Sequence, residues 1–340
     1  MPVRGHRCTQ SKFMFLFNKR QVNYCTSYRY LGVTLNEFLD YNFTADIQSE
    51  PAGRALGAII TKTIKNGGLP YNIYSMLFEC CCTSVSDYGS EIWGFEPKDG
   101  VTKIHLRAAR SFLGLPKNAT SVGVLAEINW LEPVFRAQIR MVRQFCRVFN
   151  MENSRLTKKI FLWDKQISEQ FDFQTWYKEI KNILETHNML AFLERGGDQK
   201  FNIDNLRQSM LVKQNVDIKI KCEEKPKLRT FITFKNFGIT PPYLLMPISF
   251  VQKKFIAKLR LSTLALQIKT GRYERPRLLA QNRLCLSCEN GFSVENEEHF
   301  IFSCSKYNTL RESWINQLKK PENFANLDTS EKFKIICDQP

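Results

Sequence analysis

The spacing of hydrophobic positions predicts a short β region at the start of the chain. Segments 13–17 and 21–35 are rich in Phe, Tyr, Val, Thr and Leu, and the polar Asn18-Lys19-Arg20 separates them. Two such runs divided by a polar turn predict a β-hairpin. Gly32 interrupts the second run, and a glycine inside a strand indicates a bulge or a close approach of another backbone.

Beyond about Phe43 the period becomes helical. Leu56, Ile59 and Ile60 share one face until Gly67-Gly68 ends the run. Further helices are predicted over about 71–88, 101–113, 133–149 and 248–270, and two more at the C-terminal end. The stretch 154–222 has less regular helical character, which is broken at Arg195-Gly196-Gly197-Asp198. A loop-rich join is predicted over 225–247. The predicted fold is therefore mainly α, with an N-terminal β-hairpin, a helical bundle and a small C-terminal segment.

The charge balance favours a polyanionic partner. The 340 residues contain 49 Lys and Arg against 33 Asp and Glu, a formal net charge of +16. Such an excess attracts polyanions at modest ionic strength, and nucleic acid is the first of these, although an anionic membrane surface or a ribosome would attract the chain as well. The 43% hydrophobic content is sufficient to bury real cores.

Cysteine usage and the lengths of the apolar runs bear on the compartment. The 11 cysteines are an odd number and lack the dense spacing of a small secreted disulfide scaffold, which favours a reducing environment. The run Phe13-Met14-Phe15-Leu16-Phe17 is too short for a signal-peptide core, and no stretch approaches the length of a membrane span. The sequence predicts a cytoplasmic or nuclear protein without membrane contact, and nothing in it indicates an oligomeric state.

Four arginines form a candidate phosphate track. Arg136, Arg140, Arg143 and Arg147 recur at helical intervals, so they share one stripe of the predicted 133–149 helix, opposite its apolar face. A charged stripe is usually only a solvated helix face. This one has no acidic residue beside it, which favours contacts to phosphates or to carboxylates of a partner.

A second basic region leads into the last cysteines. It comprises Lys253, Lys254, Lys258 and Arg260 on the predicted 248–270 helix, and then Lys269, Arg272, Arg275, Arg277 and Arg283. Contacts of this kind are expected to tolerate any sequence of RNA, DNA or hybrid. They are also expected to weaken steeply with salt, because phosphate contacts release counterions.

The pattern Cys285-x2-Cys288-x10-His299-x4-Cys304 indicates a metal site. Three thiolates and one imidazole have the number and the softness that a closed tetrahedral Zn²⁺ site requires. The alternative is a set of free, partly buried thiols. We expect zinc in a structural role, because four protein ligands leave no position for a water molecule.

Four blocks of the chain carry a resemblance to a known family. They read Tyr28-Arg29-Tyr30-Leu31-Gly32-Val33-Thr34-Leu35, Ala52-Gly53-Arg54-Ala55-Leu56-Gly57-Ala58-Ile59-Ile60, Asp87-Tyr88-Gly89-Ser90-Glu91-Ile92-Trp93-Gly94 and Ala108-Ala109-Arg110-Ser111-Phe112-Leu113-Gly114-Leu115. In this order they resemble the end of the palm and the thumb of reverse transcriptases from non-LTR, jockey-like retrotransposons. The Cys285 to Cys304 segment resembles the Cys/His segment that ends many of these polymerases, whereas 150–245 is matched only by position and helical character.

The resemblance implies a division of the chain and a role for its hairpin. It implies a palm-end hairpin at 1–40, a thumb-like helical region at 41–150, a helical connector at 151–245, and a basic helix with the Cys/His segment and terminal helices at 246–340. Tyr30, Leu31 and Gly32 would then correspond to the primer grip, which holds the 3′ end of the growing strand. The alternative is an ordinary edge hairpin.

The carboxylates that polymerisation requires are missing from this sequence. A palm polymerase holds two divalent metals with acidic residues on strands that, in this family, precede the Tyr-Leu-Gly hairpin. Here the first aspartate is Asp40, and no Asp-Asp pair occurs. Asp87 and Glu91 have the i, i+4 spacing of one helical face, but capping or bonding to backbone amides is the better interpretation. No catalytic residue, no Mg²⁺ site and no upstream endonuclease domain of the kind that many such elements carry are expected.

The leading hypothesis is a truncated reverse-transcriptase-like protein that binds nucleic acid and is inactive alone. One alternative is a fragment of an active RNA-directed DNA polymerase whose upstream part is missing, which an open upstream frame encoding the aspartates would reveal. Another is a non-catalytic host protein or pseudogene product whose helices and zinc segment make protein contacts only.

Overall fold

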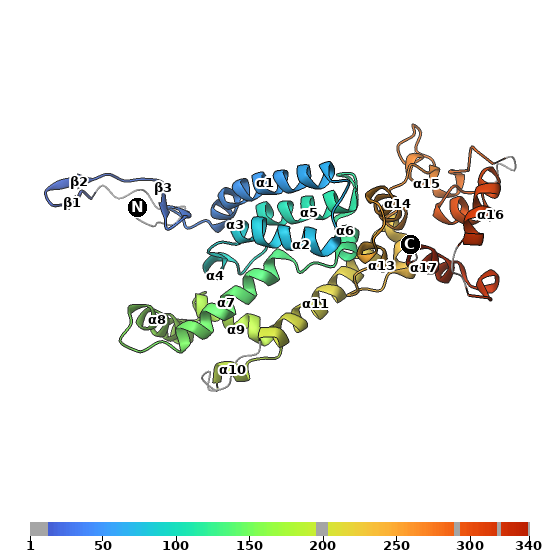
Figure 1. The fold of residues 1–340 in the computed structure, drawn as a ribbon. Coiled ribbons are helices and arrows are strands. Elements are labelled where there is room, and N and C mark those ends of the chain that lie inside the picture. Colours follow the sequence, from blue (N-terminus) through green and yellow to red (C-terminus); the bar gives the residue numbers. More distant parts are fainter. Residues whose placement is uncertain (1–12, 195–202, 289–292, 318–320, 339–340) are drawn as a thin grey trace. The chain divides into compact units, whose positions relative to one another are not determined.

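Helices dominate the part of the chain that the structure describes. The computed structural model describes residues 13–194, 203–288, 293–317 and 321–338, and within these ranges strands occur only in two small hairpins (Figure 1). The predicted mainly α fold with an N-terminal β-hairpin is confirmed. None of the described helices combines the length and the apolar character that crossing a lipid bilayer would need.

The chain forms two compact units, and each is assembled from separate stretches of sequence. The first unit comprises Met1–Ile59, Met76–His105 and Leu131–Val212, and the second comprises Ile60–Ser75, Leu106–Trp130 and Lys213–Pro340. The units interleave along the chain, whereas the regions expected from the sequence follow one another.

The single hairpin expected from the sequence is a pair of hairpins. Strand β1 (Phe15–Phe17) pairs with β2 (Arg20–Val22), and β3 (Ser27–Tyr30) pairs with β4 (Val33–Asn36), both antiparallel. The predicted second strand folds back on itself at Leu31 and Gly32, whose φ angles are 46° and 90°. Positive φ at both central residues is what a two-residue hairpin turn requires, so Gly32 occupies a turn and not a bulge.

Most predicted helices are confirmed. The helices up to the first gap are α1 (Tyr41–Lys65), α2 (Tyr71–Phe78), the π-turn η1 (Glu79–Thr83), α3 (Ser84–Ser86), α4 (Ser90–Trp93), α5 (Asp99–Leu113), α6 (Ser121–Ile128), α7 (Pro133–Phe149), α8 (Leu156–Phe171), α9 (Trp176–Thr186) and α10 (Ala191–Glu194). Pro51 lies inside α1, and Pro133 occupies the first turn of α7, where its missing N–H costs nothing. Helix α6 was not expected from the sequence.

The C-terminal half contains shorter helices than the sequence predicts. They are α11 (Ile203–Glu223), η2 (Pro226–Leu228), α12 (Arg229–Phe234), α13 (Pro242–Leu245), α14 (Phe250–Arg260), α15 (Gln267–Thr270), η3 (Ala280–Asn282), η4 (His299–Ser303), η5 (Ser305–Tyr307), α16 (Asn308–Gln317), η6 (Phe324–Asn326) and α17 (Thr329–Asp338). The helix predicted over 248–270 is therefore two helices, and the loop-rich join over 225–247 contains α12 and α13. The two terminal helices are confirmed. The break expected at Arg195–Asp198 lies outside the described residues.

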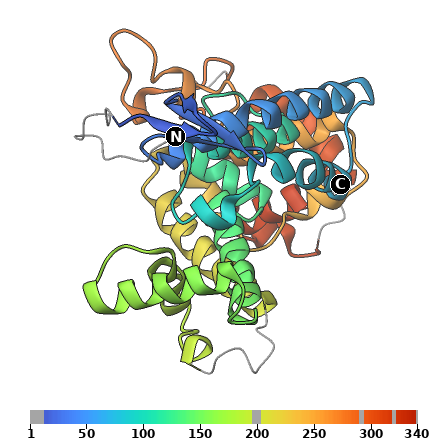
Figure 2. The same cartoon turned by 90° about the vertical axis from the view of Figure 1, so that its left-hand side faces the viewer.

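The core of the first unit is built on α7. Helices α8 and α9 lie beside its C-terminal half (Figure 1, Figure 2), where Phe145 packs edge-on against Phe161 with ring centroids 5.8 Å apart. The buried apolar residues of α7 in this core are Ile139, Met141, Val142, Phe145 and Val148. The apolar face predicted for 133–149 is therefore the face that α7 buries.

Aromatic side chains fill the core of the second unit. Tyr74 is fully buried between Phe112 and Trp130, with centroids 4.9 and 6.2 Å away. Phe234 of α12 stacks on Phe333 of α17 at 5.9 Å. The Cys/His segment belongs to the same unit.

Candidate metal centre and nucleic-acid interface

A short antiparallel bridge positions the first half of the Cys/His segment. Leu284 pairs with Val294, and the Cys285 amide donates to the Ser293 carbonyl at 2.9 Å. The Glu295 amide donates to the Arg283 carbonyl, also at 2.9 Å. These backbone bonds fix the stretch that carries Cys285 before the chain turns to Cys288.

The second half is a π-helical turn held by an arginine. His299 begins η4, where its amide donates to Asn296 Oδ1 at 2.8 Å, and the Cys304 amide closes the turn on the His299 carbonyl at 2.7 Å. Arg311 of α16 donates to the carbonyls of Ile301 and Cys304 at 2.7 and 2.6 Å. Arg311 thus holds the His-x4-Cys arm, a role that its place in the sequence did not reveal.

The four predicted ligands converge. The Sγ and imidazole nitrogen atoms of Cys285, Cys288, His299 and Cys304 all lie within 4.8 Å of one another. Cys288 Sγ is 3.2 Å from His299 Nε2 and 3.4 Å from Cys304 Sγ, and Cys285 Sγ is 3.9 Å from Cys304 Sγ. Tetrahedral zinc bonds would separate two sulfurs by about 3.8 Å and a sulfur and a nitrogen by about 3.6 Å. The group is therefore able to hold a metal ion.

The cysteines of this group differ in acidity. Desolvation raises the pKa of Cys304 to about 11. At Cys288 desolvation acts in the same direction, but hydrogen bonds from Ser305 and Cys304 outweigh it and lower the pKa to about 6. The thiolate is the form that binds metal, so Cys288 is ready to ligate at neutral pH, whereas metal binding at Cys304 has to displace a proton.

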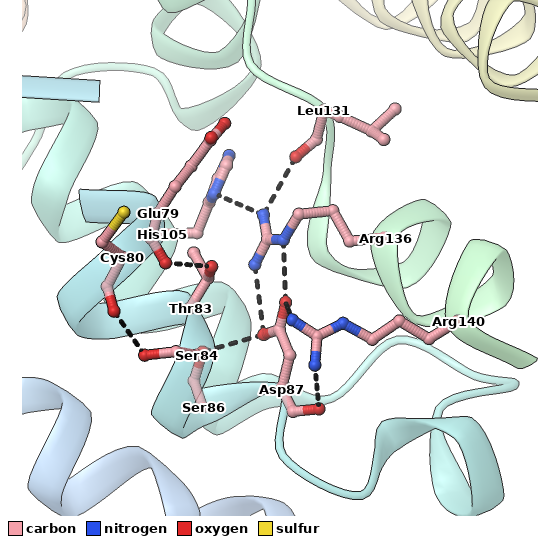
Figure 3. A network of polar contacts seen from close by, with 10 residues as sticks. All are labelled: Glu79, Cys80, Thr83, Ser84, Ser86, Asp87, His105, Leu131, Arg136 and Arg140. Carbon is pink, nitrogen blue, oxygen red and sulfur yellow. Dashed lines mark hydrogen bonds and ion pairs between the residues drawn. The ribbon is translucent and has the colours of Figure 1, made fainter. Parts of the chain in front are cut away.

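Two arginines of the predicted stripe bind a buried carboxylate in the first unit. Figure 3 shows Asp87 facing Arg136, with Arg136 Nε 2.9 Å from Asp87 Oδ2 and Nη2 3.2 Å from Oδ1. Arg140 Nη1 donates to the Asp87 carbonyl at 3.0 Å. Asp87 is only 2% exposed, so a bidentate guanidinium supplies the counter-charge that a buried carboxylate needs.

A histidine completes this network. Arg136 Nη1 lies 3.3 Å from His105 Nδ1 and donates to the Leu131 carbonyl at 3.0 Å. Burial, and then the positive charge of Arg136, hold the pKa of His105 well below its usual range, so the imidazole is neutral. The network connects α7 to the turn after α3, and within it the carboxylate of Asp87 neutralises the charge of Arg136.

The alternative arrangement of Asp87 and Glu91 does not form. Asp87 lies in the turn between α3 (Ser84–Ser86) and α4 (Ser90–Trp93), so the two carboxylates do not share a helical face. The capping role expected for Asp87 is wrong as well, because its carboxylate accepts from Arg136 and from the Ser86 hydroxyl at 2.8 Å.

The remaining arginines of the stripe face solvent. Arg143 and Arg147 are exposed, and neither has an acidic partner among the described residues. The stripe of four is thus divided between two structural and two solvent-facing guanidinium groups.

The Tyr-Leu-Gly hairpin is fixed by two other parts of the first unit. The Tyr88 hydroxyl donates to the Leu31 carbonyl at 2.8 Å, and Gln48 of α1 donates to the Gly32 carbonyl at 3.0 Å. A side chain at Gly32 would place its Cβ 3.2 Å from Tyr88 Cε1, in addition to needing a positive φ. Tyr30 and Leu31 are 62% and 75% exposed, so a rigid turn presents two large side chains to solvent.

The basic face expected on the 248–270 helix is smaller than the sequence indicates. Lys253 is buried and donates to the Leu244 carbonyl at 3.3 Å, and Arg260 is 3% exposed and paired with Glu127. Lys254 and Lys258 are more accessible. Lys253 therefore lies inside the second unit and not on a surface that meets phosphates.

Comparison with known proteins does not identify a family for this chain. No protein-family model matches the chain, and neither a curated protein nor a solved structure matches it. A functional assignment therefore has to come from the residues and contacts described above.

Proposed function

We propose that this chain is a reverse-transcriptase-like protein of the non-LTR retrotransposon type, which binds nucleic acid, holds a structural zinc ion and does not extend a primer by itself. The supporting observation is that separate blocks of the resemblance meet in space. Tyr88 of the Asp87–Gly94 block donates to Leu31 of the Tyr-Leu-Gly block, so two of the four blocks are in direct contact. Chance similarity in isolated segments would not require such contacts.

Nucleic-acid binding is supported by the balance and the placement of charge. The chain carries a formal net charge of +16, and Arg143, Arg147 and Lys254 extend from its surface. Phosphate contacts from such groups are independent of base sequence. The rigid turn with exposed Tyr30 and Leu31 supports a grip on a strand end, because an aromatic ring offers a stacking surface for a base.

Zinc is the metal that the ligand set favours. Thiolate and imidazole ligands in tetrahedral geometry select Zn²⁺ over the hard cations Mg²⁺ and Ca²⁺, which take oxygen ligands. Four protein ligands leave no open position, so the ion would stabilise the 285–304 segment and would not act on a substrate.

Native mass spectrometry of the purified chain tests the metal assignment. We expect one zinc ion per chain, lost in Cys285→Ser and retained in the control Cys80→Ser, since Cys80 is exposed and lies outside the cluster. Zinc-free protein, or equal zinc in both variants, would refute the assignment.

Two assays on one preparation test the functional proposal. We expect fluorescence anisotropy to show binding of an RNA–DNA primer-template at low salt, and primer-extension assays with Mg²⁺ or Mn²⁺ to show no product. Template-dependent synthesis would favour an active polymerase. Absence of binding at low salt would instead favour a protein that makes protein contacts only.

A further inference from the structure

The second unit contains a hollow whose wall carries basic side chains and no acidic one. Its volume is about 820 Å³, within the range of roughly 300–1,000 Å³ that is typical of ligand pockets. The lining residues come from the turn before α6, the start of η2 and the loop that precedes the Cys/His segment. Together with Arg110 of α5, these three segments contribute charge of one sign to one place.

Two of the lining arginines shape the wall. Arg283 donates to the Ile268 carbonyl at 2.9 Å and to the Leu278 carbonyl at 2.8 Å, which fixes the loop that carries Arg272 and Arg277. Arg110 donates to the Ala119 carbonyl at 3.1 Å and to the Ser121 hydroxyl at 2.8 Å. These bonds fix the turn before α6, which forms another part of the wall.

The other five basic residues have no neutralising neighbour. Lys117, Lys225, Lys227, Arg272 and Arg277 line the hollow, and none of them forms an ion pair with an acidic side chain in the described part of the chain. Five unpaired cations around one space repel one another. An anionic ligand would relieve that repulsion.

Arg272 shows this most directly. Its Nε is shielded from solvent and has no hydrogen-bond partner among the described residues. Burial lowers the pKa of Arg272, and the positive charges of Arg283, Arg229 and Arg277 lower it further. A buried donor without an acceptor is unfavourable, so the position suits an oxygen atom from a ligand.

The start of α6 adds donors to the same hollow. Thr120 is the N-cap of this eight-residue helix, and its side chain makes no capping hydrogen bond. Thr120 and Ser121 both line the hollow. The first amides of the helix and its partial positive charge therefore lie beside the cations, an arrangement that favours phosphate groups.

We propose that this hollow binds the sugar-phosphate backbone of a single-stranded nucleic acid. The inference rests on the proposed nucleic-acid-binding function and adds the site and the strand form. Pro226, Leu278 and Leu279 line the hollow beside the cations. An apolar wall offers contacts to unstacked bases, which a single strand exposes and a duplex keeps inside.

The test compares two variants with the same change in charge. The hollow variant combines Lys117→Gln, Lys225→Gln and Arg277→Gln, and the control combines Arg155→Gln, Lys159→Gln and Lys181→Gln in the first unit. All six side chains are exposed, so neither variant should unfold. Binding of a fluorescent single-stranded RNA is measured by anisotropy over a range of salt concentrations, with the same strand in duplex form as a second ligand.

Loss of three phosphate contacts should make the slope of log K against log salt shallower by about 2 for a single strand. We expect that change, and an affinity about tenfold lower or more at low salt, in the hollow variant and not in the control. Equal binding by the two variants, or a loss confined to the duplex, would overturn the site while leaving the proposed function intact. Wild-type protein that fails to bind either ligand would instead overturn the proposed function.

Discussion

At the residue scale, one buried carboxylate organises the charges of the second unit. Glu127 of α6 is fully buried, and it accepts from Arg260 Nε at 2.5 Å and from the Tyr243 hydroxyl at 2.7 Å, with Lys235 Nζ 3.9 Å away. Burial opposes its ionisation, but Arg260 and Lys235 outweigh that effect and hold the pKa of Glu127 below its usual value. The carboxylate is therefore charged, and it allows two basic side chains to be buried.

Removing this charge should destabilise the protein strongly. In Glu127→Gln, Arg260 and Lys235 would remain buried without a counter-charge, and breaking a buried pair in this way costs about 3–5 kcal/mol. Urea unfolding at neutral pH measures the loss. The control Glu312→Gln changes an exposed carboxylate of the same unit and should cost less than about 0.5 kcal/mol. Similar values for the two variants would contradict the role of Glu127.

The pH dependence of stability should carry the same signature. The folded pKa of Glu127 lies below the ordinary value of 4.5, so its contribution is present above that pH and is lost as pH falls through the folded pKa. We expect the difference in unfolding free energy between wild type and Glu127→Gln to be constant near neutrality and to shrink on acidification. A difference that grows in acid would be inconsistent with a depressed pKa.

The sequence identified candidate metal ligands better than it identified ion pairs. The spacing of Cys285, Cys288, His299 and Cys304 was sufficient to predict their convergence, because metal ligands of this kind recur at fixed intervals along a chain. Asp87 and Arg136 are 49 positions apart, and no local period links residues at that separation. Lys253 was expected at the surface because a helical pattern alone does not reveal which face of a lysine-bearing helix a neighbouring segment covers.

At the scale of elements, α4 and α7 pack through a residue without a side chain. A Cβ at Gly94 would lie 2.4 Å from Ala137 Cβ and 2.5 Å from the Ser90 carbonyl oxygen, closer than atoms can approach. The two helices lie this close only because position 94 is glycine. The close packing of α4 against α7 thus explains why the Asp87–Gly94 block ends in glycine.

Gly94→Ala should therefore force α4 away from α7. Overpacking of this kind costs about 1–3 kcal/mol and should lower the unfolding midpoint in thermal denaturation. The matched control is Gly57→Ala inside α1, where no atom beyond the neighbouring backbone of the same helix lies within 4 Å of the added Cβ and the change to alanine favours the helix by roughly 0.5–1 kcal/mol. The close approach would be disproved if the two variants were equally stable.

The Cys/His segment and the basic hollow are connected through residue 283. Arg283 lies two residues before Cys285. Its side chain fixes the loop of the hollow, and its backbone carbonyl accepts a hydrogen bond from the Glu295 amide. Chelation of the metal should therefore increase amide hydrogen exchange at 283–288 and 293–304 and leave α7 of the first unit unchanged. Exchange in these segments that does not respond to chelation would argue against a structural metal.

Prediction of the elements succeeded where local signals were strong. Pro133 and the apolar face of 133–149 defined α7 with its observed bounds. The sequence predicted one hairpin where the structure has two, because the second turn, at Leu31 and Gly32, lies within an otherwise continuous strand-like run. Helices α12 and α13 were missed because prolines and glycines surround them, and packing such as that of Phe234 on Phe333 stabilises them instead of local propensity.

At the scale of the whole molecule, both units divide their positive charge in the same way. In both, some arginines are neutralised inside the fold, by Asp87 in the first unit and by Glu127 and Glu297 in the second. Others, among them Arg143, Arg147 and the cations of the hollow, have no acidic partner among the described residues. We infer that the first group stabilises the fold, and we propose that the second group binds phosphates.

The salt dependence of nucleic-acid binding by the metal-loaded full chain tests that account most directly. Engagement of about five phosphates on a single strand should give a slope of log K against log salt near −3.5, because each contact contributes about −0.7. A binding constant that falls with this slope between about 50 and about 300 mM salt, for strands of unrelated sequence, is the result we expect. A constant that stays flat over the same range would contradict the central claim.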